Sequence, residues 1–209
     1  KAGTMGKEEN KEMEFWTQEE FQAFLECVAD KPISYYAFEM LYWTGIREGE
    51  LLALTPADFN FEKKTLRINK SYQRLEGKDV ITDPKTPKSN RTIVMPDFLA
   101  VEMEDFISSL YGIKDDDRIF TISKSYLHHE MDRGAKLAGV KRIRIHGLRH
   151  SHISLLINLG FSALAIGERV GHDAVDITYH YAHLFPTVQT DMAAQLETER
   201  EALVNVRKE

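Results

Sequence analysis

The sequence predicts an α+β domain that is mainly α-helical and carries a small antiparallel sheet. Its 209 residues are enough for one well-buried domain. Most segments place apolar side chains three and four positions apart, which is the spacing of one helix face. One stretch, residues 59 to 95, instead alternates apolar and polar side chains, as half-buried strands do.

Composition is typical of globular proteins. Hydrophobic residues make up 43% and charged residues 29% of the sequence. No run of 18 apolar residues occurs and the first residues lack a signal-peptide pattern, which argues against membrane-spanning and secreted proteins. The single cysteine excludes an internal disulfide and fits a reducing compartment. We therefore expect a cytoplasmic protein.

Charge is distributed unevenly along the chain, whose net charge is −6. Residues 1 to 30 carry three basic and eight acidic groups, a net charge of −5. Residues 63 to 91 carry nine basic and three acidic groups, a net charge of +6, and residues 133 to 167 carry six basic groups and no acidic one. The two basic stretches could present a positive face to phosphate or could simply be solvated surface.

The first helices follow a polar segment. Residues 1 to 14 lack periodicity, so we interpret them as a linker. Thr17 and Glu20 form a capping-box pattern that begins the first helix. The second begins near Ser34, is apolar on most sides and ends at Gly45, because glycine commonly terminates helices. A short third helix is expected from residue 47 to residue 54.

Three short strands are predicted next. Residues 61 to 72 alternate apolar and polar side chains, and residues 79 to 82 and 91 to 95 are also strand-like. Residues 83 to 90 have the proline-, serine- and asparagine-containing composition of a turn. We therefore expect a hairpin across residues 83 to 90 and a small antiparallel sheet of three strands.

The second half of the chain is predicted to be helical. Helical spacing of apolar residues indicates helices over residues 96 to 112, 123 to 138, 145 to 160 and 164 to 170. After Pro186 the same spacing predicts a last amphipathic helix, which forms a tail over residues 186 to 209.

A cluster of titratable side chains lies between residues 145 and 183. His146 and Arg149 are three positions apart and His150 is four from His146, so on a helix they share one face. The planar fork of donors on Arg149 suits phosphate oxygens, and a nearby phenol could attack phosphorus. We interpret the cluster as a candidate phosphoryl-transfer site. Zinc binding by His146, His150 and His152 is a weaker interpretation, since no H-E-x-x-H motif is present, and we expect no metal.

Four short motifs occur in a fixed order along the chain. They are T-G-I-R-E-G-E-L at residues 44 to 51, H-G-L-R-H at 146 to 150, V-G-H at 170 to 172 and T-Y-H-Y-A-H at 178 to 183. Together they resemble the motifs of the tyrosine recombinases, the phage integrase family, with valine at the first position of V-G-H where leucine is commoner. The resemblance covers roughly residues 15 to 190 and implies the catalytic-domain fold of that family.

Motif spacing is also similar to that of the family. The chain has 99 positions from Arg47 to His146, 23 from Arg149 to His172 and nine from His172 to Tyr181. The resemblance implies that Tyr181 attacks a backbone phosphorus and forms a 3′-phosphotyrosine, with release of a 5′-hydroxyl. Arg47, Arg149 and His172 would stabilise charge on the phosphate oxygens, and His146 would assist proton transfer at Tyr181. No cofactor is implied, because the covalent link conserves the bond energy.

Three more residues join the site by resemblance. Lys85 lies where the family carries a catalytic lysine on a hairpin and would protonate the leaving 5′-oxygen, with Lys88 as the alternative. Glu50 and His150 would orient the catalytic groups.

A second phenol lies close to the expected nucleophile. Tyr179 and Tyr181 are about 200° apart around a helix, so neither can replace the other. The family spacing favours Tyr181 as the nucleophile, and Tyr179 is expected to pack inward.

The implied function is site-specific DNA recombination, which integrates or excises a prophage or conjugative transposon. Implied partners are double-stranded DNA attachment sites, further copies of the chain in a tetramer on DNA, and directionality and bending factors, at the nucleoid of a bacterium. Two alternatives remain open. A type IB topoisomerase uses the same chemistry, and the helix pair that ends at His172 resembles a non-enzymatic helix-turn-helix regulator.

The expected organisation is a linker at residues 1 to 14, a catalytic domain at 15 to 185 and a tail helix at 186 to 209. Members of the resembling family usually carry an N-terminal DNA-binding domain, which this sequence lacks, so we interpret the chain as an isolated catalytic domain. In that family the tail docks on a neighbouring protomer. Packing of the tail on its own domain is the alternative.

Overall fold

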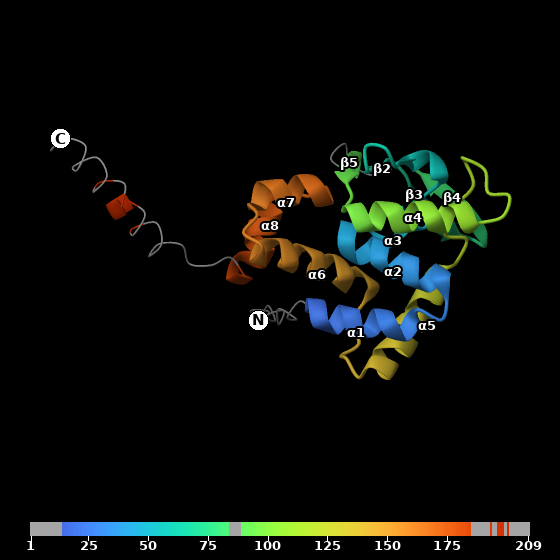
Figure 1. Cartoon of the computed structure of the whole chain (residues 1–209), viewed down its shortest axis with the longest axis horizontal. Coiled ribbons are helices and arrows are strands. Elements are labelled where there is room, and N and C mark those ends of the chain that lie inside the picture. The colour runs from blue at the N-terminus through green and yellow to red at the C-terminus, as the bar shows by residue number, and fades with distance from the viewer. Residues whose placement is uncertain (1–13, 84–88, 185–192, 194–195, 199, 201–209) are drawn as a thin grey trace, which may run out of the picture.

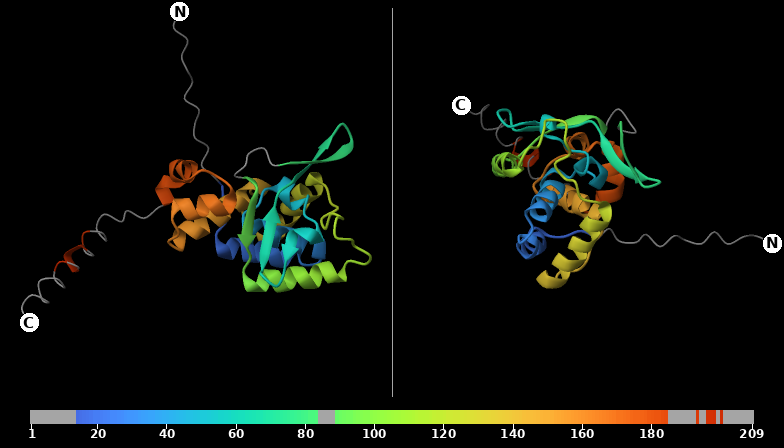
Figure 2. Two further views of the ribbon diagram at one scale, coloured as in Figure 1. Left: turned by 90° about the horizontal axis from the view of Figure 1, so that it is seen from above. Right: turned by 90° about the vertical axis from the view of Figure 1, so that its right-hand side faces the viewer.

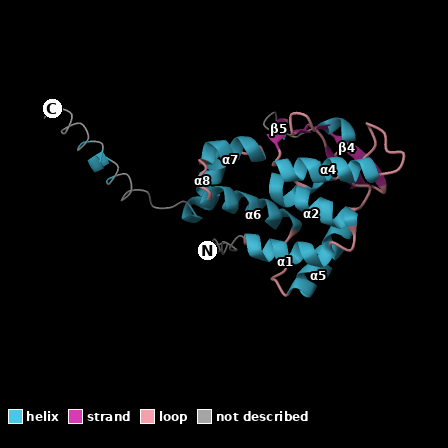
Figure 3. Ribbon diagram, in the orientation of Figure 1, coloured by secondary structure: helices cyan, strands magenta, loops and turns pink. Residues whose placement is uncertain are grey.

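Helices form most of the fold, and the strands gather in one region beside α3 and α4 (Figures 1 and 3). The computed structural model describes residues 14–83, 89–184, 193, 196–198 and 200. The helices are α1 (Gln18–Val28), α2 (Pro32–Thr44), α3 (Glu48–Leu51), α4 (Asp97–Ser109), α5 (Lys124–Ala138), α6 (Ile145–Asn158), α7 (Ala163–Val170) and α8 (Ala174–Tyr181), with 3₁₀ turns at Pro56–Asp58 and Ala182–Leu184. The strands are β1 (Phe59–Asn60), β2 (Thr65–Ile68), β3 (Ser71–Leu75), β4 (Lys78–Thr82) and β5 (Arg91–Val94). The predicted mainly helical α+β class is confirmed.

The capping box at the start of α1 is present as predicted. Thr17 Oγ1 accepts a hydrogen bond from the backbone N–H of Glu20 at 3.2 Å, and Glu20 accepts one from the backbone N–H of Thr17 at 2.9 Å. The helix packs its apolar face on α5. Gly134 of α5 allows the close approach, since a Cβ there would lie 2.4 Å from Phe24 and 2.6 Å from Val28.

The end of α2 brings the chain to the centre of the molecule. Gly45 ends the helix with a φ of 64°, a left-handed conformation that glycine adopts without strain. A Cβ at Gly45 would lie 2.5 Å from Cδ2 of His152 in α6, so glycine also permits the contact between these helices. Arg47 follows two residues later and occupies the N-cap position of α3.

Two antiparallel sheets form where one was expected. In the described residues the three-stranded sheet has the order β1-β2-β5, and β3 pairs with β4 in a separate hairpin that projects from the body (Figure 2). The predicted hairpin between residues 79 to 82 and 91 to 95 is therefore wrong. The tight turn is instead at Glu76 and Gly77, whose φ values of 49° and 79° are those that a two-residue hairpin turn requires. The strand predicted over residues 61 to 72 is divided between β2 and β3.

Buried apolar residues form a large and a small cluster. The large cluster joins α1 to α6 and the three-stranded sheet. The small cluster consists of six residues from α6, α7 and α8: Ile153, Ile157, Ile166, Val170, Ile177 and Tyr181. The candidate nucleophile Tyr181 thus belongs to the small cluster.

Some predicted segments fall outside the described residues. These are most of the linker at residues 1 to 14 and most of the tail at 186 to 209. Among the helices that are described, none combines the length and apolar character needed to cross a membrane.

Replacement of Gly134 by alanine tests the close packing of α1 on α5. The added methyl group must displace buried side chains, so we expect Gly134→Ala to lower the free energy of unfolding by about 1 to 3 kcal/mol. Leu137→Ala is the control, because Leu137 of the same helix is 63% exposed. It should change stability by less than about 0.5 kcal/mol. Urea denaturation measures both, and equal effects would contradict the packing argument.

Candidate active site

The C-terminal end of α7 receives three arginine side chains. Arg91 donates from Nε at 2.9 Å, Arg149 donates from Nη2, and Arg47 donates from Nη2 at 3.5 Å. Their acceptors are the three successive carbonyl oxygens of residues 169, 170 and 171. These carbonyls lack partners within the helix and lie at the negative end of its dipole. The helix end therefore gathers three cations that lie far apart in the sequence.

Glu50 is the carboxylate at the centre of this cluster. Its Oε1 accepts hydrogen bonds from Nη1 of Arg47 at 2.8 Å and Nη1 of Arg91 at 3.0 Å. Its Oε2 accepts from the backbone N–H of Arg47 at 2.8 Å and Nη2 of Arg91 at 2.9 Å. Burial alone would raise the pKa of Glu50, but Arg91 and then Arg47 hold the pKa below its ordinary value. Glu50 is therefore a buried anion shared by two arginines.

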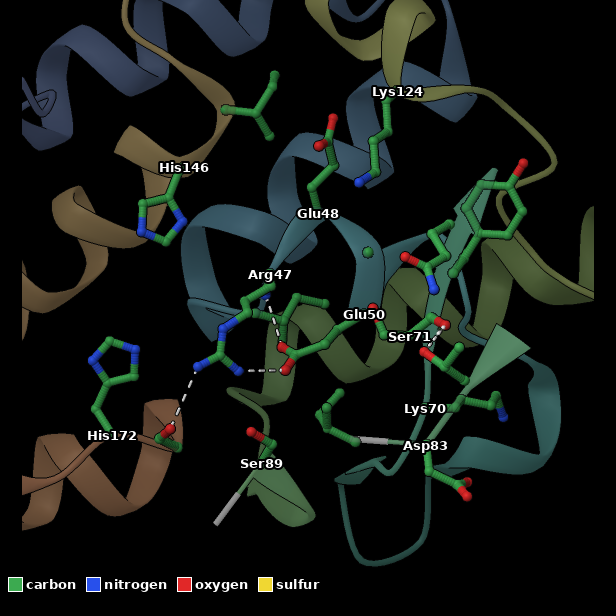
Figure 4. Close-up of a pocket in the computed structure, with 18 of the residues that line it drawn as sticks. Arg47, Glu48, Glu50, Lys70, Ser71, Asp83, Ser89, Lys124, His146 and His172 are labelled. Carbon is green, nitrogen blue, oxygen red and sulfur yellow. Dashed lines mark hydrogen bonds and ion pairs between the residues drawn. The ribbon is translucent and has the colours of Figure 1, made fainter. Parts of the chain in front are cut away.

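A cavity of about 670 Å³ opens in front of the cluster. Arg47, Glu50, His146 and His172 all line the cavity, and Figure 4 shows the two imidazoles on the same side of Arg47. The structure thus brings together four of the predicted site residues from α3, α6 and the segment after α7.

The structure does not describe the predicted lysine. Lys85 and its alternative Lys88 lie outside the described residues. Asp83 and Ser89, which flank residues 84 to 88, both line the cavity.

Arg149 lies behind the cavity rather than in its wall. The residue is 2% exposed and donates from Nη1 to the carbonyl of Gly45 at 2.6 Å, in addition to its bond to α7. Burial, and then the charge of Arg47, lower the pKa of the guanidinium to about 9, which leaves Arg149 cationic near neutral pH. Its Nε has no hydrogen-bond partner in the part of the chain that the structure describes.

Tyr181 is buried against His150. The tyrosine is 4% exposed, and its hydroxyl forms a hydrogen bond with Nδ1 of His150. Burial raises the pKa of Tyr181 to about 12, partly offset by the charge of Arg149, so the phenol is neutral. His146, to which the sequence assigned proton transfer, has its ring centroid 4.8 Å from that of His150. The imidazole bonded to the nucleophile candidate is thus the one predicted only to orient other groups.

The prediction for Tyr179 is wrong. Its side chain does not pack inward but is 82% exposed. Helix α8 packs through Ile177 and Tyr181, which are four positions apart and share one face. Tyr179 lies between them in sequence and therefore points away from the domain.

Two arginines of the site were missed by sequence reasoning. Arg91 begins β5, in which alternate residues are buried, so its side chain shares the inward face with Ile93. An arginine on the apolar face of a strand was the available signal. Arg169 donates from Nε to Nε2 of His152 at 3.0 Å, and no pattern in the sequence indicated this pair.

His152, once weighed as a zinc ligand, accepts a hydrogen bond from a cation and is 2% exposed. Within the described residues, no group of three or more His, Cys, Asp or Glu side chains is arranged to hold a metal ion.

Comparison with known proteins identifies the family. The model of the phage integrase family matches residues 14–187. The chain belongs to the phage integrase family. It is 32% identical over 202 residues to the ICEBs1 integrase of Bacillus subtilis strain 168, covering 90% of the chain and 55% of that protein. It is 30% identical over 179 residues to the integrase of Staphylococcus phage L54a, covering 77% of the chain and 51% of that protein.

Solved structures of integrases share the fold. The Tn1549 transposon integrase in complex with a circular intermediate DNA has a TM-score of 0.75 and 21% identity, covering 93% of this chain and 68% of that one. The catalytic domain of bacteriophage HP1 integrase has a TM-score of 0.62 and 20% identity, covering 88% of this chain and 95% of that one. The chain spans about half the length of the curated relatives it matches.

Three histidines, of which His152 is buried and His150 and His172 are half-buried, should remain neutral in mildly acidic solution. Burial, followed by neighbouring positive groups, lowers the pKa of His150 and His172 to about 4 and that of His152 to about 3. Their imidazole NMR signals should therefore not titrate between about pH 8 and pH 5. In urea the same signals should titrate near pH 6.5. The unfolded chain then takes up protons that the folded chain does not, so these groups lower stability as pH falls from 6.5 towards 4. A midpoint near 6.5 in the folded chain would contradict this.

Proposed function

We propose that the domain cleaves and rejoins DNA strands by attack of Tyr181 on a backbone phosphorus, as a site-specific tyrosine recombinase. The observation that carries the proposal is the wall of the cavity, where Arg47, His146 and His172 face one space with Arg149 directly behind it. Such a set of donors suits a phosphate whose non-bridging oxygens gain charge in the transition state.

Each residue of the site has one role in the cleavage reaction. The phenol of Tyr181 loses its proton as its oxygen bonds to phosphorus, and the bond from phosphorus to the 5′-oxygen breaks. The 3′-phosphotyrosine and a free 5′-hydroxyl result, and attack by a 5′-hydroxyl reverses the step. His146, which lines the cavity, assists the proton transfer once Tyr181 has left its contact with His150 and entered the cavity, and Lys85 gives a proton to the leaving oxygen. Glu50 and His150 orient their neighbours, and the chemistry uses neither a metal nor another cofactor.

The nucleophile must move to reach DNA. Tyr181 is buried and does not line the cavity with the other groups. Its helix α8 is short and follows a turn at residues 171 to 173, so a shift of α8 can expose the phenol without disturbing the large apolar cluster.

The substrate class follows from the relatives. Their names are ICEBs1 integrase, integrase of a Staphylococcus phage, and tyrosine recombinase XerC-like. Their names favour integration and excision of a mobile element over DNA relaxation and over a helix-turn-helix regulator. The proposed substrate is therefore a pair of double-stranded attachment sites, with directionality and bending factors as further partners at the bacterial nucleoid.

Assembly of four copies on DNA is the second part of the proposal. Exposed apolar side chains gather on the last three helices and their links: Leu159, Phe161, Leu164, Val175 and Tyr179. We propose that these five exposed residues, called the apolar face below, receive the tail, residues 186 to 209, of a neighbouring copy. Its apolar positions need a surface to cover, because an isolated helix of that length is marginal in water.

The decisive experiment compares two tyrosines of α8. A nicked duplex of the attachment site from the encoding element releases its short 5′-hydroxyl strand after cleavage, so the covalent adduct accumulates on a denaturing gel. We expect no adduct from Tyr181→Phe, with DNA affinity within about twofold and a stability loss of about 1 kcal/mol from the lost hydrogen bond. Tyr179→Phe is the matched control and should form the adduct at the normal rate. An adduct from Tyr181→Phe that is absent from Tyr179→Phe would reverse the assignment.

Removal of the tail tests the assembly proposal. Deletion of residues 187 to 209 should leave a folded domain that binds a single DNA site but assembles on paired sites at least about tenfold less well, because each copy loses one contact. Leu164→Asp on the apolar face should have the same effect. Tyr111→Asp, at a still more exposed residue after α4, is the control. Normal assembly of the deleted chain in native gels would exclude docking of the tail.

A further inference from the structure

Arg91 joins three parts of the site without entering the cavity. Its side chain is 5% exposed. It contacts Glu50 of α3, the carbonyl of Arg169 at the end of α7 at 2.9 Å, and the carbonyl of Ser89 at 3.1 Å. Arg91 does not line the cavity, and each of its three guanidinium nitrogens already donates to a protein acceptor, so we do not assign it a contact with the phosphate. Any effect of Arg91 on the reaction must pass through its neighbours.

The contact with Glu50 has the geometry of a bidentate pair. Two nitrogens of Arg91 reach the two carboxylate oxygens at 3.0 and 2.9 Å, which fixes the plane of the carboxylate. The same carboxylate accepts from Nη1 of Arg47 at 2.8 Å on its other side. The orientation of the carboxylate therefore determines where the guanidinium of Arg47 lies. Arg47, unlike Arg91, lines the cavity.

The contact with α7 has a second consequence. The carbonyl that accepts from Arg91 belongs to residue 169, and His172 follows three residues later. Arg47 reaches the carbonyl of Gly171 in the same turn, at 3.5 Å. Arg91 thus fixes α3 and the end of α7 relative to one another, and with them Arg47 and His172.

We propose that Arg91 is a positioning residue for strand cleavage. It keeps Glu50 ionised and oriented, so that Arg47 presents its guanidinium to the phosphate in register with His172. The proposal rests on the function proposed above, because it names a further residue for the same site. It differs from a purely structural role, in which Arg91 would only add stability to the fold.

The test replaces Arg91 by glutamine and by lysine. In Arg91→Gln only Arg47 opposes the effect of burial on Glu50, so the pKa of Glu50 should rise by about 1 to 3 pH units. Arg91→Lys keeps the positive charge but loses the bidentate geometry. The pKa of Glu50 in this variant should therefore be close to its value in the unsubstituted chain. Carboxyl carbon NMR of the chain without DNA follows Glu50 from pH 3 to pH 8.

Lys31→Gln is the matched control. Lys31 lies 2.6 Å from Glu130, a carboxylate that is 4% exposed and also bonded to Arg133, so the substitution again removes one of two cations from a buried glutamate. The pair of Lys31 and Glu130 lies outside the candidate site. It should change stability but neither the titration of Glu50 nor strand cleavage.

Single-turnover formation of the covalent adduct supplies the second measurement. We expect Arg91→Gln to bind the nicked duplex with an unchanged Kd and to cleave it about 10- to 100-fold more slowly, which is the usual cost of a misplaced catalytic group. The loss of cleavage rate should be greatest at pH values below the raised pKa of Glu50, because the carboxyl is protonated there. It should be smallest at pH 8. Arg91→Lys should recover most of the rate.

Three outcomes would overturn the inference: an unchanged titration of Glu50 in Arg91→Gln, a rate loss that is equal at every pH and follows the folded fraction, or the same pH profile in Lys31→Gln. Failure of the proposed function looks different. The unsubstituted chain would then form no adduct, while the titration of Glu50 would still decide whether Arg91 controls that carboxylate.

Discussion

Burial of guanidinium groups with their partners is the constraint on which the rest of the structure depends. Transfer of an unpaired charge from water into a protein interior costs several kcal/mol even after relaxation. Arg149 and Arg91 are nevertheless almost fully buried, with Glu50 as the carboxylate between Arg91 and Arg47. Backbone carbonyls provide the remaining acceptors, at the end of α2 and over residues 169 to 171 of α7. The two helices must therefore end where they do, since a further helical turn would occupy these oxygens.

That requirement explains why short-range sequence features have long-range effects. Gly45 ends α2 and leaves its own carbonyl for Arg149, while its missing side chain admits His152. Gly171 ends α7 in the same left-handed conformation, with a φ of 72°, and its carbonyl accepts from Arg47. Both glycines belong to motifs that were identified in the sequence. Their role in the structure is to end the two helices and leave backbone carbonyls free to accept from the arginines. The local sequence determines where α2 and α7 end, and Arg47 and Arg149 donate to the carbonyls at these ends.

Helix caps and apolar spacing are local signals, so the sequence predicted the helices, while the resemblance of short motifs to those of the family pointed to the cavity residues Arg47, His146 and His172. Arg91 was missed, since its importance comes from partners 41 and 78 positions away. The hairpin was misplaced because the proline-containing segment was a more conspicuous turn than Glu76 and Gly77, whose conformation is seen only in the backbone. The direction of Tyr179 depends on which face of α8 packs, and a helix of eight residues gives too little periodicity to decide that.

The separation of the apolar interior into two clusters bears on how such a protein can evolve. The six residues of the small cluster contact one another across α6, α7 and α8, whereas the large cluster stabilises the rest of the domain. A substitution in α8 therefore disturbs few neighbours beyond its own unit. Substitutions of these side chains can change how α8, which carries Tyr181, packs on the domain, while the charged groups around Glu50 stay unchanged. The packing of α8 can therefore diverge among related proteins while the rest of the domain keeps its structure.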